Sequence, residues 1–81
     1  MLQYNWGVRH VNLSADLTKR EIECLNWLAH GLRTDQIANQ LSISRATVDF
    51  HLANARKKLA ASTREQAVAL AVAGKFIDPT K

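Results

Sequence analysis

The spacing of apolar residues is the feature that most limits what this chain can fold into. Across residues 17–74 they recur every three or four positions, which is the period of an α-helix. No sustained alternation of apolar and polar residues predicts a strand, and no internal repeat appears. The sequence therefore predicts an all-α fold. Its clearest apolar stripe is Val48, Leu52, Ala55 and Leu59.

Capping residues divide this stretch into four helices. Thr18 followed by Glu21 has the pattern of a capping box, in which each side chain accepts a hydrogen bond from the other residue's backbone N–H. Thr63 and Gln66 repeat that pattern near the end of the chain. Gly31 suits the left-handed position that ends many helices, and Gly74 ends the last one. We expect helices at residues 17–31, 34–41, 44–59 and 63–73.

A very short turn joins the two middle helices. Thr34 and Ser44 are expected to cap them, because short hydroxyl side chains bond to the free N–H groups at helix starts. Two short helices joined by three or four residues have the geometry of a helix-turn-helix. We expect that motif at about residues 34–59, with the second helix in a DNA major groove.

Basic residues gather in this same part of the chain. The 81-residue chain has a net charge of +4, and residues 44–64 hold five basic residues and one acid, Asp49. A local basic excess is typical of a surface that binds phosphate, although an ordinary solvated patch has the same composition. The length suits one small domain.

Other kinds of chemistry lack supporting residues. The single cysteine, Cys24, cannot form a disulfide within the chain and fits a reducing cytoplasm. The histidines do not have metal-ligand spacing, and no nucleophile motif is present. No apolar run reaches the ~18 residues that a membrane span needs. We expect a cytoplasmic protein that is not an enzyme, has no catalytic residues, and needs no cofactor, metal or membrane.

From residue 17 onward the sequence resembles the C-terminal DNA-binding domain of LuxR-type transcription regulators. The matching stretches are LTKREIECLNWLAHG (17–31), QIANQLSISRATVDFHLANARKKL (36–59) and STREQAV (62–68). The TVDFH stretch, with Trp27, is most similar to the quorum-sensing branch, whose members carry an N-terminal domain that binds an acyl-homoserine lactone. The resemblance implies a four-helix LuxR-type helix-turn-helix domain at residues 17–81, preceded by an arm or linker at residues 1–16.

The sequence departs from this family at two places. Where Arg33 and Gln36 stand, the family often has Ser or Thr and then Glu, so the cap is expected to shift to Thr34. Where Asp49 and Ala53 stand, basic or amide residues are common. Base specificity therefore cannot be carried over from relatives.

The resemblance assigns roles to individual residues. Four should face base edges, and Phe50 among them suits a thymine methyl or, alternatively, a partly exposed core position. Thr47 and Lys58 should bind phosphates, with four further candidates nearby. The base-facing residues are Arg45, Asp49, Phe50 and Ala53, and the phosphate set is Arg33, Thr34, Thr47, Arg56, Lys57 and Lys58.

The last helix, at about residues 63–74, predicts a partner. It is apolar on all sides, and such a helix is usually buried on all sides. We expect double-stranded DNA as a partner and a homodimer that is weak without DNA, with RNA polymerase as a further candidate. The alternatives are a promoter-reading domain like that of sigma factors and a helical module that binds an acidic protein. The expected dimer residues are Val68, Ala69, Val72 and Ala73.

Overall fold

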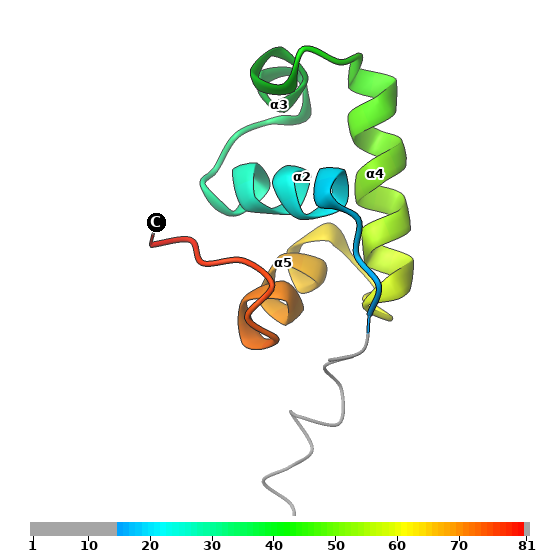
Figure 1. The fold of residues 1–81 in the computed structure, drawn as a ribbon, viewed down its shortest axis with the longest axis vertical. Coiled ribbons are helices and arrows are strands. Elements are labelled where there is room, and N and C mark those ends of the chain that lie inside the picture. The colour runs from blue at the N-terminus through cyan, green and yellow to red at the C-terminus, as the bar shows by residue number, and fades with distance from the viewer. Residues whose placement is uncertain (1–14, 81) are drawn as a thin grey trace, which may run out of the picture.

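The computed structural model describes residues 15–80 and shows four α-helices and no strand within them. The all-α expectation is confirmed, and each helix falls inside the range expected for it. The expected arm or linker at residues 1–16 lies outside the described residues except for its last two positions. The helices are α2 (Lys19–Ala29), α3 (Thr34–Leu41), α4 (Arg45–Lys58) and α5 (Arg64–Ala73) (Figure 1).

The helices surround one shared core. α2 lies across α4, while α3 and α5 lie on either side of α2 and each packs against both α2 and α4 (Figure 1). Every helix contributes buried side chains, because each carries an apolar stripe that must leave water. The largest fully buried side chains are Leu25, Ile37, Val48, Leu52 and Leu59, together with Cys24.

Two of the expected helix starts are confirmed. Thr18 Oγ1 accepts a hydrogen bond from the Glu21 backbone N–H at 3.1 Å, and Glu21 Oε1 accepts one from the Thr18 N–H at 2.9 Å. Ser44 Oγ accepts a hydrogen bond from the Thr47 N–H at 3.0 Å at the start of α4. These bonds satisfy N–H groups that have no partner inside the helix.

Of the other two starts, α3 has a different cap residue, and α5 has the expected cap without the full capping box. Thr34 is not a cap but the first residue of α3, and the cap position belongs to Arg33. The Gln36 side chain reaches back to accept a hydrogen bond from the Arg33 N–H at 2.9 Å, which favours a start one residue earlier. At α5, Thr63 bonds the Gln66 N–H as expected, but the Gln66 side chain accepts from the Ser62 N–H instead of completing the box.

All four helices end in the same way. The residue after the last turn has a positive φ, and the next N–H returns to a carbonyl five residues back, which is a Schellman motif. The predicted Gly31 takes this position after α2, with φ +91°. The other three positive-φ residues have side chains: Ser42 after α3, Ala60 after α4 and Lys75 after α5.

The last of these reversals brings a C-terminal segment onto the core. The Phe76 N–H donates to the Ala71 carbonyl at 2.9 Å, Ile77 is buried, and Phe76 packs half-buried beside it. The sequence did not predict this contact, because two apolar residues between a glycine and a proline show no period.

Candidate nucleic-acid interface

The outer side of α4 forms one edge of the molecule (Figure 1). Val48 and Leu52 are buried on its inner side, and the positions opposite them are exposed or half-buried. Arg45, Ala46, Phe50 and Lys57 are exposed there, and Ala53 is half-buried. Because α3 and the turn 42–44 precede it, α4 occupies the position of the second helix of a helix-turn-helix.

Phe50 is the most exposed large apolar side chain among the described residues, at 62%. Its ring lies edge-on to His51, with centroids 5.8 Å apart, and it makes no part of the core. This excludes the core position that the sequence left open. A solvent-exposed aromatic ring on a well-formed helix is suited to contact with another molecule.

Asp49 is joined to a residue of another helix. Its Oδ1 lies 2.9 Å from Nη2 of Arg64, the first residue of α5, and the two side chains are 46% and 39% exposed. The resemblance predicted Asp49 on the base-facing side, but nothing in the sequence predicted Arg64 as its partner. Residues 15 positions apart in different helices share no local pattern that could have shown it.

The phosphate candidates near the start of the motif are accessible in different degrees. The Arg33 side chain is 72% exposed and lies 3.3 Å from Asp35. Slight desolvation raises the pKa of Asp35, but the hydrogen bond from Arg33 outweighs it and holds that pKa below its ordinary value. Such a surface pair is weak, so Arg33 can exchange Asp35 for a phosphate. Thr34 and Thr47 are half-buried.

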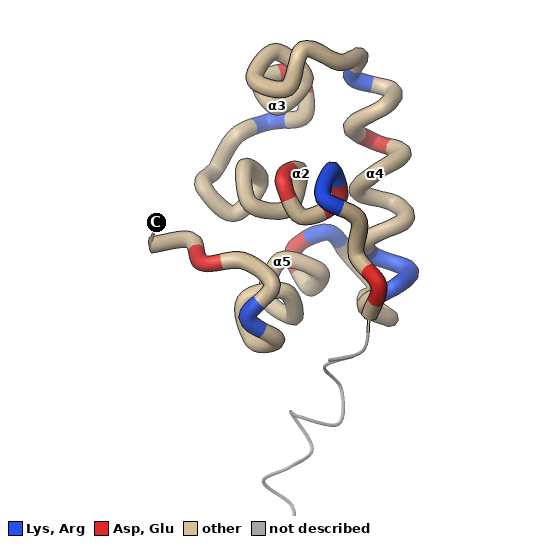
Figure 2. The backbone as a smooth tube through the Cα atoms, viewed as in Figure 1, with Lys and Arg blue, Asp and Glu red and all other residues tan. Residues whose placement is uncertain are grey.

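Three consecutive basic residues close α4, where Figure 2 shows the positive charge gathered. Their side chains differ in what they contact. Arg56 Nη1 donates to the Ala61 carbonyl at 2.9 Å, which ties the helix end to the following loop. Lys57 is exposed. Lys58 turns inward, toward α2.

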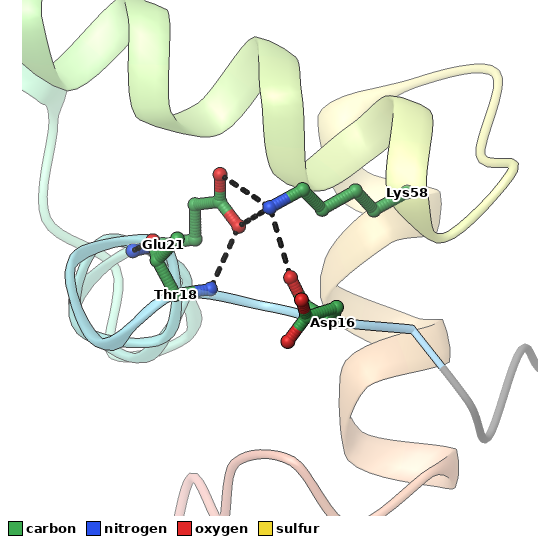
Figure 3. A network of polar contacts seen from close by, with 4 residues as sticks. All are labelled: Asp16, Thr18, Glu21 and Lys58. Atoms are coloured by element: carbon green, nitrogen blue, oxygen red, sulfur yellow. Dashed lines mark hydrogen bonds and ion pairs between the residues drawn. The ribbon is translucent and has the colours of Figure 1, made fainter.

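Lys58 takes part in a network that reaches the start of α2 (Figure 3). Its Nζ lies 2.8 Å from Glu21 Oε1, 3.2 Å from Oε2 and 2.9 Å from the Asp16 carbonyl. The Glu21 side chain is 4% exposed. Burial raises the pKa of Glu21, but hydrogen bonds from Lys58 and the Thr18 N–H outweigh it, so the pKa lies below its ordinary value. Lys58, which the resemblance assigns to phosphate binding, therefore has a structural role in this fold.

The expected dimer residues on α5 do not all face solvent. Ala69, Val72 and Ala73 are exposed, with Val72 at 37%, whereas Val68 is half-buried against the core. Val68 therefore serves the monomer's own packing at least in part. The remaining three make a small apolar surface beside the C-terminal segment.

Residues 15–80 were also compared with the requirements of a thiol nucleophile, a metal site and a membrane span. Burial, together with nearby Glu23 and Glu21, raises the pKa of the Cys24 thiol to about 11, against the opposing effect of Arg20, so Cys24 is a core residue and not a nucleophile. No group of three or more metal-ligating side chains occurs in this part of the chain. None of its helices has both the length and the hydropathy to cross a bilayer.

Residues 15–71 match the family of bacterial regulatory proteins named luxR. The chain is 46% identical over 65 residues to the transcriptional activator protein VanR of Vibrio anguillarum, covering 80% of this chain and 27% of that protein. It is 45% identical over 73 residues to the quorum sensing-dependent transcriptional regulator VjbR of Brucella ovis, covering 89% and 28%.

A third relative is the transcriptional activator protein LuxR of Aliivibrio fischeri, 44% identical over 63 residues, with 78% of this chain and 25% of that protein covered. The chain spans about a quarter of the length of these relatives. No solved structure matched it.

Proposed function

Because the chain belongs to the luxR family of bacterial regulatory proteins, we propose that it is a sequence-specific DNA-binding domain that regulates transcription, with α4 as the reading helix. The observation that carries the proposal is the outer side of α4, where an exposed aromatic ring and cations stand opposite the buried stripe. A helix of this kind fits the major groove, where each base pair shows a distinct pattern of donors and acceptors.

We propose distinct roles for the two sets of side chains. Arg45, Asp49, Phe50 and Ala53 face base edges, and Phe50 contacts a thymine methyl. The phosphate contacts fix the register of the helix on the duplex. Lys57 and Arg33 are the best exposed of these, and the full set is Arg33, Thr34, Thr47, Arg56, Lys57 and Lys58.

We further propose that two copies pair through α5 when bound to DNA. Val72 and the small exposed residues beside it would bury a limited area, and interfaces below ~1,200 Å² are typically transient. Two copies related by a two-fold axis would read half-sites roughly 10 base pairs apart.

The regulator to which the domain belongs is a separate proposal. The name of VjbR supports a quorum-sensing regulator, and the names of VanR and LuxR support a transcriptional activator. Such a regulator would act in the cytoplasm, where the bacterial chromosome lies, with RNA polymerase as a candidate partner. The family match favours this proposal over a sigma-factor promoter-reading domain and over a module for an acidic protein.

Selection from a pool of random DNA duplexes tests the proposal. The protein is expected to enrich one sequence motif, and its affinity for the enriched duplex should fall steeply as salt rises, since neutralised phosphates release counterions. Polyglutamate serves as the acidic competitor. Equal binding to polyglutamate and to every duplex would contradict base reading and favour a module for acidic proteins.

A further inference from the structure

One ion pair on the outer side of the domain joins the reading helix to the next helix. Asp49 lies in the second turn of α4, and Arg64 opens α5. Their side chains meet at 2.9 Å, through Arg64 Nη2 and Asp49 Oδ1. Both remain partly exposed, so the pair can be reached by a bound duplex.

The position of Arg64 is not explained by the stability of α5. A cation in the first turn lies at the positive end of the helix dipole, where it is unfavourable, whereas Glu65 beside it is favourable there. An exposed ion pair also contributes at most about 1 kcal/mol to folding. The ion pair therefore has a larger consequence for the charge and position of Asp49 than for the stability of α5.

A carboxylate beside a DNA groove faces strong repulsion. The duplex carries one negative charge per ~1.7 Å of its axis, so an unpaired Asp49 would oppose the approach of α4. The Arg64 guanidinium balances that charge at contact distance. It also fixes the side chain, because an arginine N–H has a defined direction.

The paired carboxylate keeps acceptor capacity for a base. An ionised aspartate has two oxygens with about four lone-pair sites, and Arg64 contacts Oδ1. Because Oδ2 belongs to the same planar carboxylate, holding Oδ1 restricts the positions that Oδ2 can take. In the major groove, the donor that suits a carboxylate is the amino group of cytosine.

We propose that Arg64 is a positioning residue for base readout: it neutralises Asp49 and holds it so that Oδ2 accepts a hydrogen bond from a cytosine amino group. The inference rests on the proposed function and assigns part of the sequence specificity to a residue outside the reading helix. Arg64 then contributes to the choice of base without contacting the base.

The test compares base preference across matched variants. The parent, Arg64→Met, Arg64→Lys, Asp49→Ala and the double variant are each used to select sites from a random duplex pool. Affinities are then measured on the parent's enriched duplex and on one with the critical C·G pair changed to T·A. Lys57→Met is the control for loss of one exposed cation.

The parent should discriminate between the two duplexes by about 5- to 150-fold. Arg64→Met and Asp49→Ala should lose that preference at the same base pair, and the double variant should lose no more than either. Arg64→Lys, which keeps the charge and a donor, should retain part of it. Lys57→Met should weaken binding to both duplexes alike.

The inference is overturned if Arg64→Met keeps the parent's preference and only weakens binding to all duplexes, as Lys57→Met does, because Arg64 would then be a phosphate contact alone. It is also overturned if Asp49→Ala selects the parent's sites. A parent that enriches no sequence contradicts the proposed function and the inference together. Matching thermal unfolding of Arg64→Met and Lys57→Met shows that the comparison is between folded proteins.

Discussion

At the scale of single residues, Glu21 holds two helices together. Its carboxylate completes the N-terminal cap of α2 and receives the ammonium of Lys58 from the end of α4 (Figure 3). A buried carboxylate is costly unless it is paired and hydrogen-bonded, and here it is both. Removing either partner should therefore destabilise the fold.

We expect Glu21→Gln to lower the free energy of unfolding at neutral pH by about 1.5–3 kcal/mol, the usual range for a hydrogen bond to a charged group. Because the folded-state pKa of Glu21 lies below its ordinary value of 4.5, its contribution is present above that value. The contribution is lost as pH falls through the folded-state pKa. Denaturant unfolding at neutral and acid pH measures both effects, and the variant should show a shallower loss in acid.

Glu23→Gln is the matched control, because the Glu23 side chain is 33% exposed and its pair with Arg20, at 3.1 Å, lies at the surface. We expect its free energy of unfolding to change by less than about 0.5 kcal/mol. Equal effects of the two substitutions would contradict the role given to Glu21.

Two adjacent lysines offer a second matched pair. Lys57→Ala should lower the slope of log affinity against log salt by about one, with unfolding unchanged, because an exposed cation is free to meet a phosphate. Lys58→Ala should lower the slope as well and should also lower the free energy of unfolding, since it leaves Glu21 buried without its cation. Salt titrations on one mixed-sequence duplex measure the slopes. An unchanged slope for Lys58→Ala would remove Lys58 from the proposed phosphate contacts and leave it a structural residue.

The partners of these charges lie beyond the reach of a sequence pattern. The positions of Asp49 and Lys58 on α4 follow from helical periodicity. Their ion pairs with Arg64 and Glu21 depend on how α4 packs against α5 and α2. A stripe of charges therefore predicts a surface, but tertiary packing decides which charges remain available to a ligand.

At the scale of helices, the sequence predicts where a helix starts better than where it ends. Thr18 and Ser44 predict helix starts correctly because a cap bond is local and needs a particular side chain. The ends are less evident because three of the four Schellman positions hold residues other than glycine. Ala60 and Lys75 adopt positive φ where the chain turns back to pack the following residues on the core. Residue preferences for positive φ do not predict this.

These endings predict opposite effects for two substitutions. Ala60→Gly should raise the free energy of unfolding by about 0.5–1 kcal/mol, because it relieves a positive φ of 56° at an exposed alanine. Gly31→Ala should lower it by about 1 kcal/mol through backbone strain alone, since a Cβ there meets nothing within 4 Å. Thermal and denaturant unfolding measure both. Changes of the same sign would contradict the argument.

At the scale of the whole molecule, the exposed side of α5 is where the domain is expected to meet a second copy. The sequence predicted this surface from a helix apolar on all sides, and three of its four residues are exposed. It did not predict that Ile77 would return to cover part of the core. The chain reverses at Lys75 because the following residues pack on the core. The sequence of α5 alone therefore could not predict how much of its apolar surface stays exposed.

Val72→Glu should abolish cooperative binding to a duplex with two half-sites, because it places a charge in an apolar contact with no partner. Binding to a single half-site should change little, since Val72 lies on α5 and not on the reading helix. Gel-shift titrations on both duplexes measure this. Val72→Ala removes apolar area without adding charge and should weaken cooperativity less. Undiminished cooperativity in Val72→Glu would place the dimer contact elsewhere.

The shared oxygen of Glu21 makes one backbone amide a reporter on a distant part of the chain. Glu21 Oε1 receives both the Thr18 N–H and the Lys58 ammonium, at 2.9 and 2.8 Å. The Thr18 proton can exchange with solvent deuterium only when that oxygen releases it. Loosening the end of α4 should therefore speed deuterium uptake at Thr18, 40 positions earlier in the sequence. Its exchange rate therefore reports how firmly α4 is anchored, without any label on the outer side of that helix.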